Sequence, residues 1–221
     1  AAAHIKKRKL SKIQRRVVDR FNEHFEHVRK CKLGNDGKQP TTIDIHNAGI
    51  EAPAVLLTGD PGSGKSYVID TICQLASIHD VGHVVTTSYN GIAAVNVDGS
   101  TLSSMFKIHS QDGGYAATSL TEDGLAKMRS DLGHNKIAMV IIDEVSTIDT
   151  KIIALLDCRL KQLLNCDLPF GGMPILFAGD FNQLGPVQKK FIPQDMIKWA
   201  TRLRKMRMLD NIPSPQTTLS E

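Results

Sequence analysis

AVLLTGDPGSGKSYVIDTI, residues 54–72, carries the clearest structural signal in this chain. A short apolar run leads into a glycine-rich loop, and a segment with helical spacing of apolar residues follows. The loop fits the pattern G-x-x-x-x-G-K-[ST], which binds phosphate when it joins a strand to a helix. The stretch therefore predicts a strand–loop–helix unit with a phosphate site at its turn.

The chemistry of this loop follows from its residue types. Glycines let the backbone approach a phosphate without a Cβ in the way, and successive N–H groups at a helix N-terminus attract an anion. Lys65 would reach the β- and γ-phosphates, and the Ser66 hydroxyl would hold Mg²⁺. A glycine-rich turn without a ligand is the alternative, which the flanking strand and helix patterns disfavour. The predicted nucleotide-binding residues are Gly59, Asp60, Pro61, Gly62, Ser63, Gly64, Lys65 and Ser66.

Composition places the chain among globular proteins of reducing compartments. It has 221 residues, 41% of them hydrophobic and 23% charged, which is typical of a soluble domain. No apolar run is long enough to span a bilayer, and no secretory signal is visible. The 4 cysteines lack the paired spacing of a zinc site or a disulfide framework. We therefore expect an intracellular protein without a membrane partner.

The net charge of +4 is concentrated near the two ends of the sequence. A basic run within residues 1–9 is expected to be disordered, and it is either a nucleic-acid contact or nuclear address, or a solvated tail. A second basic group, containing Arg202, Arg204 and Arg207, falls in a helix predicted over residues 194–209. The excess of positive charge fits a polyanionic partner without requiring one.

Apolar patterns along the chain alternate between strands and helices, so the predicted fold class is α/β with a mainly parallel sheet. A helix is expected to begin at Ser11, where Ser11-x-x-Gln14 matches a capping box, and residues 38–53 are expected to form a loop. A small excursion from the core is expected near residues 107–135. The remaining strands are predicted at residues 84–88, 137–142 and 174–178, and the remaining helices at residues 121–132 and 149–164.

A second chemical signal is AMVIIDE, residues 138–144, an apolar strand that ends in two carboxylates. A buried strand that delivers an aspartate at its carboxyl end is the Walker B arrangement, in which Asp143 would hold Mg²⁺. The adjacent Glu144 would orient or deprotonate the attacking water. The alternative is a plain solvated strand end, which the phosphate loop in the same chain disfavours.

A third signal is PFGGMPILFAGDFNQLGPV, residues 169–187. Its strand brings Gly179, Asp180 and Gln183 to the same edge of the predicted sheet. A glutamine in that place can hydrogen-bond the γ-phosphate or the attacking water. Taken alone, Gln183 would be interpreted as a surface residue of a loop.

In the order GDPGSGKS, TSYNGIAAVNVDGSTLSSMF, VIIDEVSTID and PFGGMPILFAGDFNQLGPV, these strings resemble the first RecA-like domain of the Pif-type (petite integration frequency) DNA helicases, superfamily 1 relatives of RecD. The resemblance covers roughly residues 10–190. It implies a RecA-like ATPase domain that uses ATP and Mg²⁺ and couples hydrolysis to 5′-to-3′ movement on single-stranded DNA. It also implies work in DNA repair, recombination and telomere or genome maintenance, in the nucleus first and the mitochondrion second.

The resemblance assigns a role to each matching residue. Lys65 and Ser66 contact phosphate and Mg²⁺, Asp143 contacts Mg²⁺, and Glu144 activates the water. Gln183 becomes the γ-phosphate sensor, and Gln14 matches the glutamine that reads adenine in the family. This last role competes with the capping-box interpretation of Gln14, and both remain open.

The segment TSYNGIAAVNVDGSTLSSMF matches the first single-strand contact region of the family. Backbone and hydroxyl groups there would position DNA through its phosphates, and Tyr89 or Phe106 would stack on bases, unless Phe106 belongs to the core. The chain departs from the family pattern at Asn90, Ser103 and Gly185. The predicted DNA-binding residues are Thr87, Ser88, Thr101, Ser104 and Phe106.

The family also uses a second RecA-like domain, and no later helicase motif is recognisable in the 34 residues after Val187. The expected organisation is a basic tail at 1–9, the ATPase domain at 10–190 and a helix with a frayed end at 191–221. The first hypothesis is therefore the ATP-binding half of a DNA helicase. A truncated, ATP-gated module that binds DNA or protein without motor work is the alternative, and a P-loop ATPase of another lineage is a weaker third hypothesis.

Overall fold

A computed structural model describes residues 10–88, 101–111, 114–116, 120–132 and 137–180. Four strands form a parallel sheet in the order β1-β6-β5-β2. The predicted α/β fold with a mainly parallel sheet is confirmed. The strands are β1 (Ala54–Thr58), β2 (His83–Ser88), β5 (Ile137–Asp143) and β6 (Ile175–Gly179).

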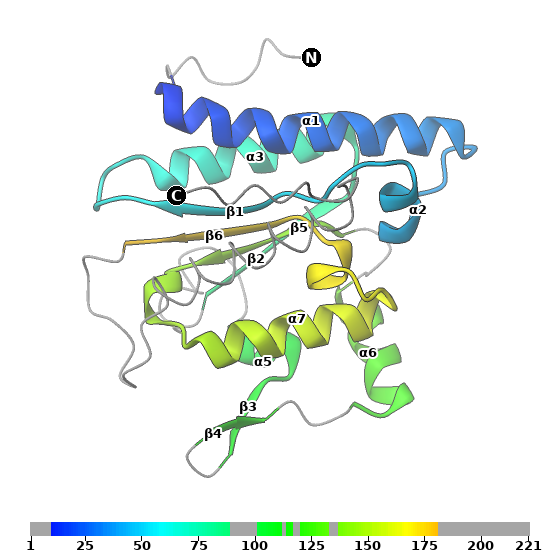
Figure 1. Ribbon diagram of the computed structural model, residues 1–221, viewed down its shortest axis with the longest axis vertical. Helices are drawn as coiled ribbons and strands as arrows, with labels where there is room; N and C mark the ends of the chain where they lie inside the picture. Colours follow the sequence, from blue (N-terminus) through cyan, green and yellow to red (C-terminus); the bar gives the residue numbers. More distant parts are fainter. Residues whose placement is uncertain (1–9, 89–100, 112–113, 117–119, 133–136, 181–221) are drawn as a thin grey trace, which may run out of the picture.

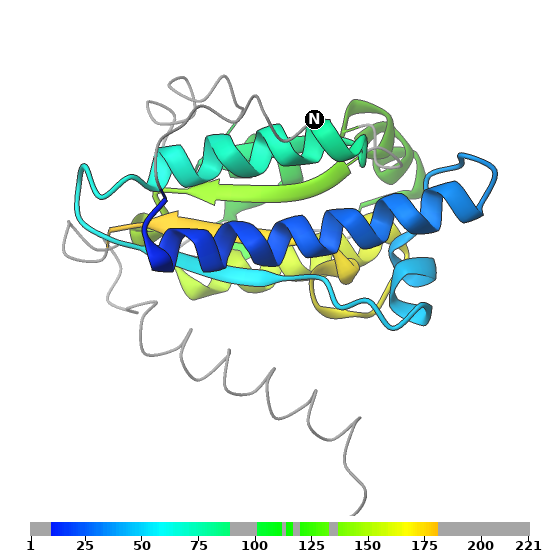
Figure 2. The ribbon, with the colours of Figure 1, turned by 90° about the horizontal axis from the view of Figure 1, so that it is seen from above.

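Helices cover both faces of this sheet (Figure 1). One face carries α1 (Lys12–Gly34) and α3 (Lys65–His79), which lie side by side (Figure 2). The other face carries α7 (Thr150–Leu164), with α5 (Leu102–Phe106) and α6 (Glu122–Leu132) next to it. Each face buries its own apolar cluster, so the sheet is the middle layer of three.

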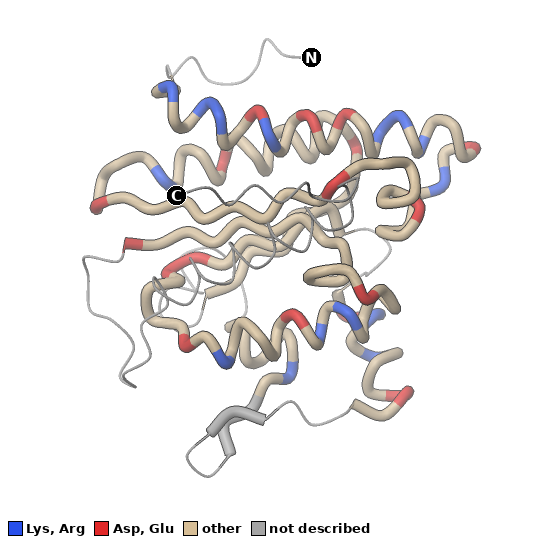
Figure 3. The backbone as a smooth tube through the Cα atoms, viewed as in Figure 1, with Lys and Arg blue, Asp and Glu red and all other residues tan. Residues whose placement is uncertain are grey.

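Charge is distributed in agreement with these layers. Figure 3 shows lysine, arginine, aspartate and glutamate along the helices and loops rather than along the middle of the sheet. All residues of β5 before Asp143 are buried, which explains the near-continuous apolar run that predicted a strand covered on both faces. In the described segments, no helix combines the length and the apolar character needed to cross a membrane.

Local capping signals decide where three of the helices begin. Ser11 N-caps α1, and its hydroxyl and the Gln14 side chain form the predicted capping box. Asp149 N-caps α7, with Oδ1 accepting from the Lys151 amide at 2.8 Å. Thr121 accepts from the Gly124 amide at 3.2 Å before α6. These side chains satisfy amides that have no partner inside the helix.

The expectation of a loop over residues 38–53 is wrong in its middle, because α2 (Thr42–Asn47) lies there. Thr41 and Asp44 form a second capping box, in which the Thr41 amide donates to Asp44 Oδ2 at 2.9 Å. The spacing Thr41-x-x-Asp44 carried this signal in the sequence. The predicted excursion near residues 107–135 contains the hairpin of β3 (His109–Gln111) and β4 (Gly114–Ala116), followed by α6.

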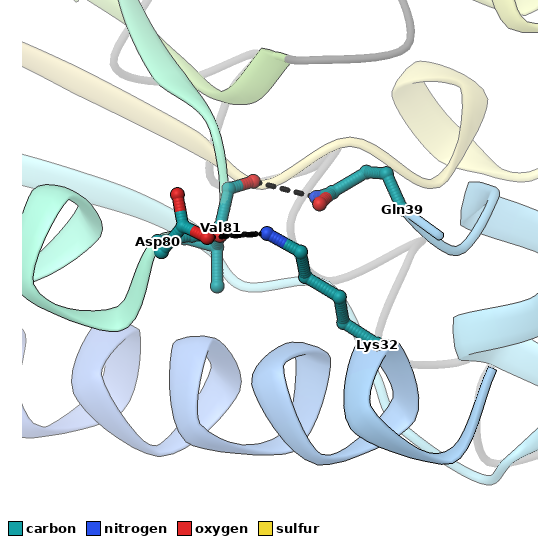
Figure 4. A network of polar contacts seen from close by, with 4 residues as sticks. All are labelled: Lys32, Gln39, Asp80 and Val81. Atoms are coloured by element: carbon teal, nitrogen blue, oxygen red, sulfur yellow. Dashed lines mark hydrogen bonds and ion pairs between the residues drawn. The ribbon is translucent and has the colours of Figure 1, made fainter. Parts of the chain in front are cut away.

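A polar network joins the ends of α1 and α3 at the amino edge of the sheet (Figure 4). The Lys32 ammonium donates to the Asp80 carbonyl at 2.9 Å and pairs with the Asp80 carboxylate. Nearby, the Gln39 side-chain amide donates to the Val81 carbonyl at 2.6 Å. The network therefore fixes the chain between the end of α3 and the start of β2.

The string P-F-G-G forms a tight turn, η4 (Pro169–Gly172), against α7. Phe170 has a φ of 53° and packs its ring 5.8 Å from that of Phe177. Asp157 of α7 accepts from the Phe170 amide at 2.6 Å. A Cβ on Gly171 would lie 2.7 Å from the Leu160 carbonyl oxygen. This string therefore acts through packing, by setting the entry of the chain into β6.

Candidate functional site

The phosphate loop lies between the end of β1 and the start of α3, at the carboxyl edge of the sheet (left in Figure 1). Gly62 and Gly64 have φ values of 76° and 88°, which residues with a Cβ rarely adopt. Gly64 is the N-cap of α3 and has no side chain with which to cap the helix. The first-turn amides of α3 are thus available to an anion.

Lys65, the first residue of α3, is folded onto its own loop. Its ammonium donates to the carbonyls of Gly59 at 2.6 Å and Asp60 at 3.2 Å. The side chain is half-buried, whereas Ser66, the next residue, is exposed. A phosphate over the loop would compete with these two carbonyls for the ammonium, since all are hydrogen-bond acceptors.

Asp143 ends β5, and the chain turns sharply immediately after it. Its Oδ1 accepts from the Glu144 amide at 2.9 Å, and Glu144 has a φ of 55° before the short helix η3 (Val145–Thr147). Thr147 Oγ1 donates to the Glu144 carbonyl at 2.9 Å. This left-handed turn ends the strand conformation directly after Asp143.

Alternation along β5 shows which face of the sheet Asp143 occupies. Ile141 packs in the cluster under α1 and α3, and Ile142 packs in the cluster under α7. Since side chains alternate along a strand, Asp143 projects to the face of α3. The fold thus brings Asp143 and Ser66 to the same face and the same edge, and a hydroxyl and a carboxylate suit Mg²⁺.

Gln14 lies beside the phosphate loop and is half-buried. Its Oε1 accepts from the Ser11 amide at 2.8 Å, and its Nε2 donates to the Ser63 carbonyl at 3.0 Å. A Cβ on Gly64 would lie 2.7 Å from that Nε2. The capping-box interpretation is confirmed, and the same side chain also holds the loop. Reading of adenine by Gln14 stays a prediction.

Of the residues predicted to contact DNA, some are buried and others are not. Phe106 is 1% exposed and belongs to the apolar core, so the prediction that its ring stacks on bases is wrong. The side chains of Thr87 and Ser88 are 0% exposed, which corrects the expectation that their hydroxyls contact DNA. Thr101 N-caps α5, accepting from the Ser104 amide at 3.2 Å, and Ser104 is exposed.

Several predictions lie outside the described residues. They concern Gln183, Tyr89, the basic tail at 1–9 and residues 191–221 with their predicted helix.

Arg159 of α7 is a structural residue that the sequence analysis missed. It is 0% exposed, and its Nε donates to the Phe106 carbonyl at 3.0 Å while Nη1 donates to Gln162 Oε1 at 2.7 Å. Burial lowers the pKa of the guanidinium. Arg159 thereby holds the end of α5, and a charged residue on the apolar stripe of α7 was the available signal.

Comparison with known sequences shows the family. The sequence model of the "PIF1-like helicase" family matches residues 42–206. The ATP-dependent DNA helicase Pif1 of Psychrobacter sp. (strain PRwf-1) is 37% identical over 154 residues, which cover 68% of this chain and 22% of the relative. The ATP-dependent DNA helicase RRM3 of Saccharomyces cerevisiae is 34% identical over 141 residues, covering 62% of this chain and 19% of the relative.

Solved structures agree with this assignment. Bacteroides Pif1 bound to ssDNA matches with a TM-score of 0.51 and 26% identity, over 78% of this chain and 36% of that one. Bacteroides sp Pif1 in complex with ADP-AlF4 matches with a TM-score of 0.51 and 27% identity, over 72% of this chain and 35% of that one. The chain spans 22% of the length of the Psychrobacter Pif1 and 19% of the length of RRM3, about a fifth of each. With the phosphate loop, the strand ending in Asp143 and the family match all present, the chain belongs to the PIF1-like helicase family.

Proposed function

We propose that this chain is the nucleotide-binding half of an ATP-dependent DNA helicase. The observation that carries the proposal is the shared edge of the sheet, where the phosphate loop, Lys65 and Asp143 meet on the face of α3. The site fits a Mg²⁺-bound triphosphate, because the first turn of α3 offers uncapped amides and Gly62 and Gly64 adopt conformations that favour glycine.

Each residue of the site has a defined role in this proposal. Lys65 exchanges its bonds to the Gly59 and Asp60 carbonyls for bonds to phosphate oxygens. Ser66 and Asp143 hold Mg²⁺, which when bound neutralises charge on the phosphates. Glu144 orients or deprotonates the attacking water, and Gln183 senses the γ-phosphate.

The partners are proposals as well, because the chain spans only 22% and 19% of the two curated relatives named above. We infer a second RecA-like domain that supplies arginine to the γ-phosphate, and single-stranded DNA as the track. The match to a Pif1 bound to ssDNA supports this partner. Movement in the 5′-to-3′ direction, work in repair, recombination and telomere maintenance, and a place in the nucleus or mitochondrion belong to the same proposal.

Nucleotide binding tests the phosphate loop directly. Lys65→Ala should abolish binding of a fluorescent ADP with Mg²⁺, because the variant loses the ammonium that contacts the β-phosphate. Lys127→Ala is the matched control, since Lys127 is exposed on α6 away from the loop. Retention of affinity in the Lys65 variant would refute the assignment of the loop.

Turnover tests the proposed role of a second domain. An arginine supplied from another domain contributes roughly 10³–10⁵ in rate, so the 221-residue chain should hydrolyse ATP slowly and should not displace a DNA strand. Efficient strand displacement by this chain would contradict the proposal. Stimulation of the residual hydrolysis by single-stranded DNA would favour a motor half over a binding module. The intact pair Asp143–Glu144 also argues against a binding module.

A further inference from the structure

Ser88, the last residue of β2, has a hydroxyl that is buried without a hydrogen bond. The residue is 0% exposed, and within the part of the chain that the structure describes its Oγ has no hydrogen-bond partner. Buried polar atoms in native proteins are nearly always paired, and an unpaired one points to a functional role or to a bound water or ion. The unpaired hydroxyl therefore requires an explanation from its surroundings.

Strand register places this hydroxyl beside Asp143. Ser88 and Asp143 are Cα partners in the parallel pairing of β2 with β5, and adjacent strands lie about 4.8 Å apart. Partners in register project to the same face. Ile142, the preceding residue, faces α7, so Ser88 and Asp143 both project toward the face of α3. Ser88 thus lies at the edge and on the face of the proposed nucleotide site.

A second unpaired hydroxyl follows the carboxylate pair in η3, whose backbone lies against Gly179 of β6. Ser146 Oγ in η3 has no hydrogen-bond partner among the described residues, and Ser146 is 3% exposed. The Asp143 carboxylate bonds the Glu144 amide through Oδ1 and does not engage the Ser88 hydroxyl. One buried hydroxyl without a partner is thus beside Asp143 in the sheet, and another follows Glu144 by two residues.

We propose that Ser88 is a positioning residue for the Mg²⁺-bound nucleotide. In this proposal, the Ser88 hydroxyl hydrogen-bonds a water ligand of the ion held by Asp143. The inference rests on the proposed nucleotide function. Mg²⁺ in nucleotide sites keeps several water ligands and takes only one or two carboxylates from the protein. A serine hydroxyl both donates and accepts, so it can bond such a water and orient it beside the carboxylate.

The test measures how strongly Mg²⁺ binding and nucleotide binding are coupled in the 221-residue chain. A fluorescent ADP is titrated at several Mg²⁺ concentrations, and again with the metal chelated. Ser88→Ala should raise the Mg²⁺ concentration needed for tight ADP binding roughly 10-fold. Loss of a residue that hydrogen-bonds a metal ligand typically lowers metal affinity by about this factor. The affinity for ADP without metal should be unchanged.

Thermal stability without ligand gives the second measurement. Removal of an unpaired buried hydroxyl should raise the Tm of Ser88→Ala by about 2–4 °C. Gain of stability combined with loss of Mg²⁺ coupling is the pattern expected here, and a merely structural serine would not produce it. Ser88→Cys keeps a similar volume with a poor hydrogen-bonding group, so it should show the same loss of coupling as the alanine variant.

Thr86→Val is the matched control, because Thr86 lies two residues earlier on the same strand and face, about 6.6 Å further from the edge. It should keep normal coupling. Unchanged coupling in Ser88→Ala, or parallel loss of stability and of metal-free affinity, would overturn the inference and leave the nucleotide function intact. A parent chain that shows no Mg²⁺-dependent ADP binding would overturn both.

Discussion

The two edges of the central sheet differ in how their polar groups are hydrogen-bonded. At the amino edge, Lys32 and Gln39 bond the chain between α3 and β2. There too, Asp157 bonds the backbone of η4, and Arg129 donates to the Leu163 and Gln162 carbonyls at the end of α7 at 2.9 and 3.1 Å. This edge is tied together by its side chains.

At the carboxyl edge, Lys65 and Gln14 bond carbonyls of the phosphate loop, but several other polar groups of the described residues have no such bonds. Gly64 leaves α3 uncapped, and the hydroxyls of Ser88 and Ser146 lack partners within the described segments. Among the described residues, the amino edge has one comparable atom, Nδ1 of His79, whose Nε2 bonds Asn22 Oδ1 at 2.9 Å. Burial also lowers the pKa of His79, and a neutral imidazole tolerates an unpaired nitrogen better than a charged one. The amino edge therefore stabilises the fold, whereas the carboxyl edge leaves polar groups available to a ligand.

Gly171→Val should give the largest loss of stability, because η4 anchors the amino edge. The new side chain would meet the Leu160 carbonyl at 2.7 Å in a backbone with a φ of +64°, and strain together with overpacking should cost about 4 kcal/mol. Urea unfolding measures this change. Gly34→Ala, where a Cβ meets nothing within 4 Å, should be nearly neutral. Equal effects at the two glycines would contradict a stabilising role for the amino edge.

His24 should make the amino edge sensitive to acid. Burial lowers its pKa to about 4, and its Nδ1 lies 3.2 Å from the Glu51 carbonyl. The unfolded chain therefore binds the proton first, and stability should fall as the pH drops from about 6.5 to about 4, by about 3 kcal/mol.

Chemical denaturation at a series of pH values measures this dependence. His24→Gln should flatten the curve, because glutamine has no group that titrates in this range. The same replacement at the exposed His83 should preserve the slope. A steep slope that survives in the His24 variant would assign the acid sensitivity to other groups.

Gln14 separates capping from loop contact at the carboxyl edge. Gln14→Ala loses both bonds and should cost about 1 kcal/mol. Gln14→Glu keeps the acceptor for the Ser11 amide but loses the donor to the Ser63 carbonyl. We expect near-normal stability and a roughly 5-fold lower ADP affinity, as one lost hydrogen bond would give. Unchanged affinity would make Gln14 a capping residue alone.

Lys32→Met should have the smallest effect. The pair with Asp80 lies near the surface, with the aspartate side chain 86% exposed, and solvent screens such pairs. The loss of stability should be small and should shrink further in 1 M salt. Thermal unfolding at low and high salt measures this change, and a large effect independent of salt would show that packing of the lysine stem matters more than its charge.

The predictable part of the fold and of the site came from short-range signals. Three features depend only on residues a few positions apart: the phosphate loop, the strand ending in Asp143 and the capping box at Ser11. A short stretch of sequence is therefore enough to predict each of them. The capping-box spacing of Thr41 and Asp44 could also have predicted the start of α2. Apolar periodicity is less reliable: Ile13 continues the i, i+4 spacing of Val17 and Phe21 in α1, yet it is 71% exposed.

The sequence alone specified the strand–loop–helix unit, the alternation of the main strands and helices, and the residue types at the phosphate site, whereas α2 and α5 were not predicted. Only the tertiary structure decided that Phe106 belongs to the core and that Gln14 touches the loop 49 residues away. It also decided that Ser88 stands beside Asp143. Burial and strand register depend on segments far apart in the chain, so a local pattern cannot specify them.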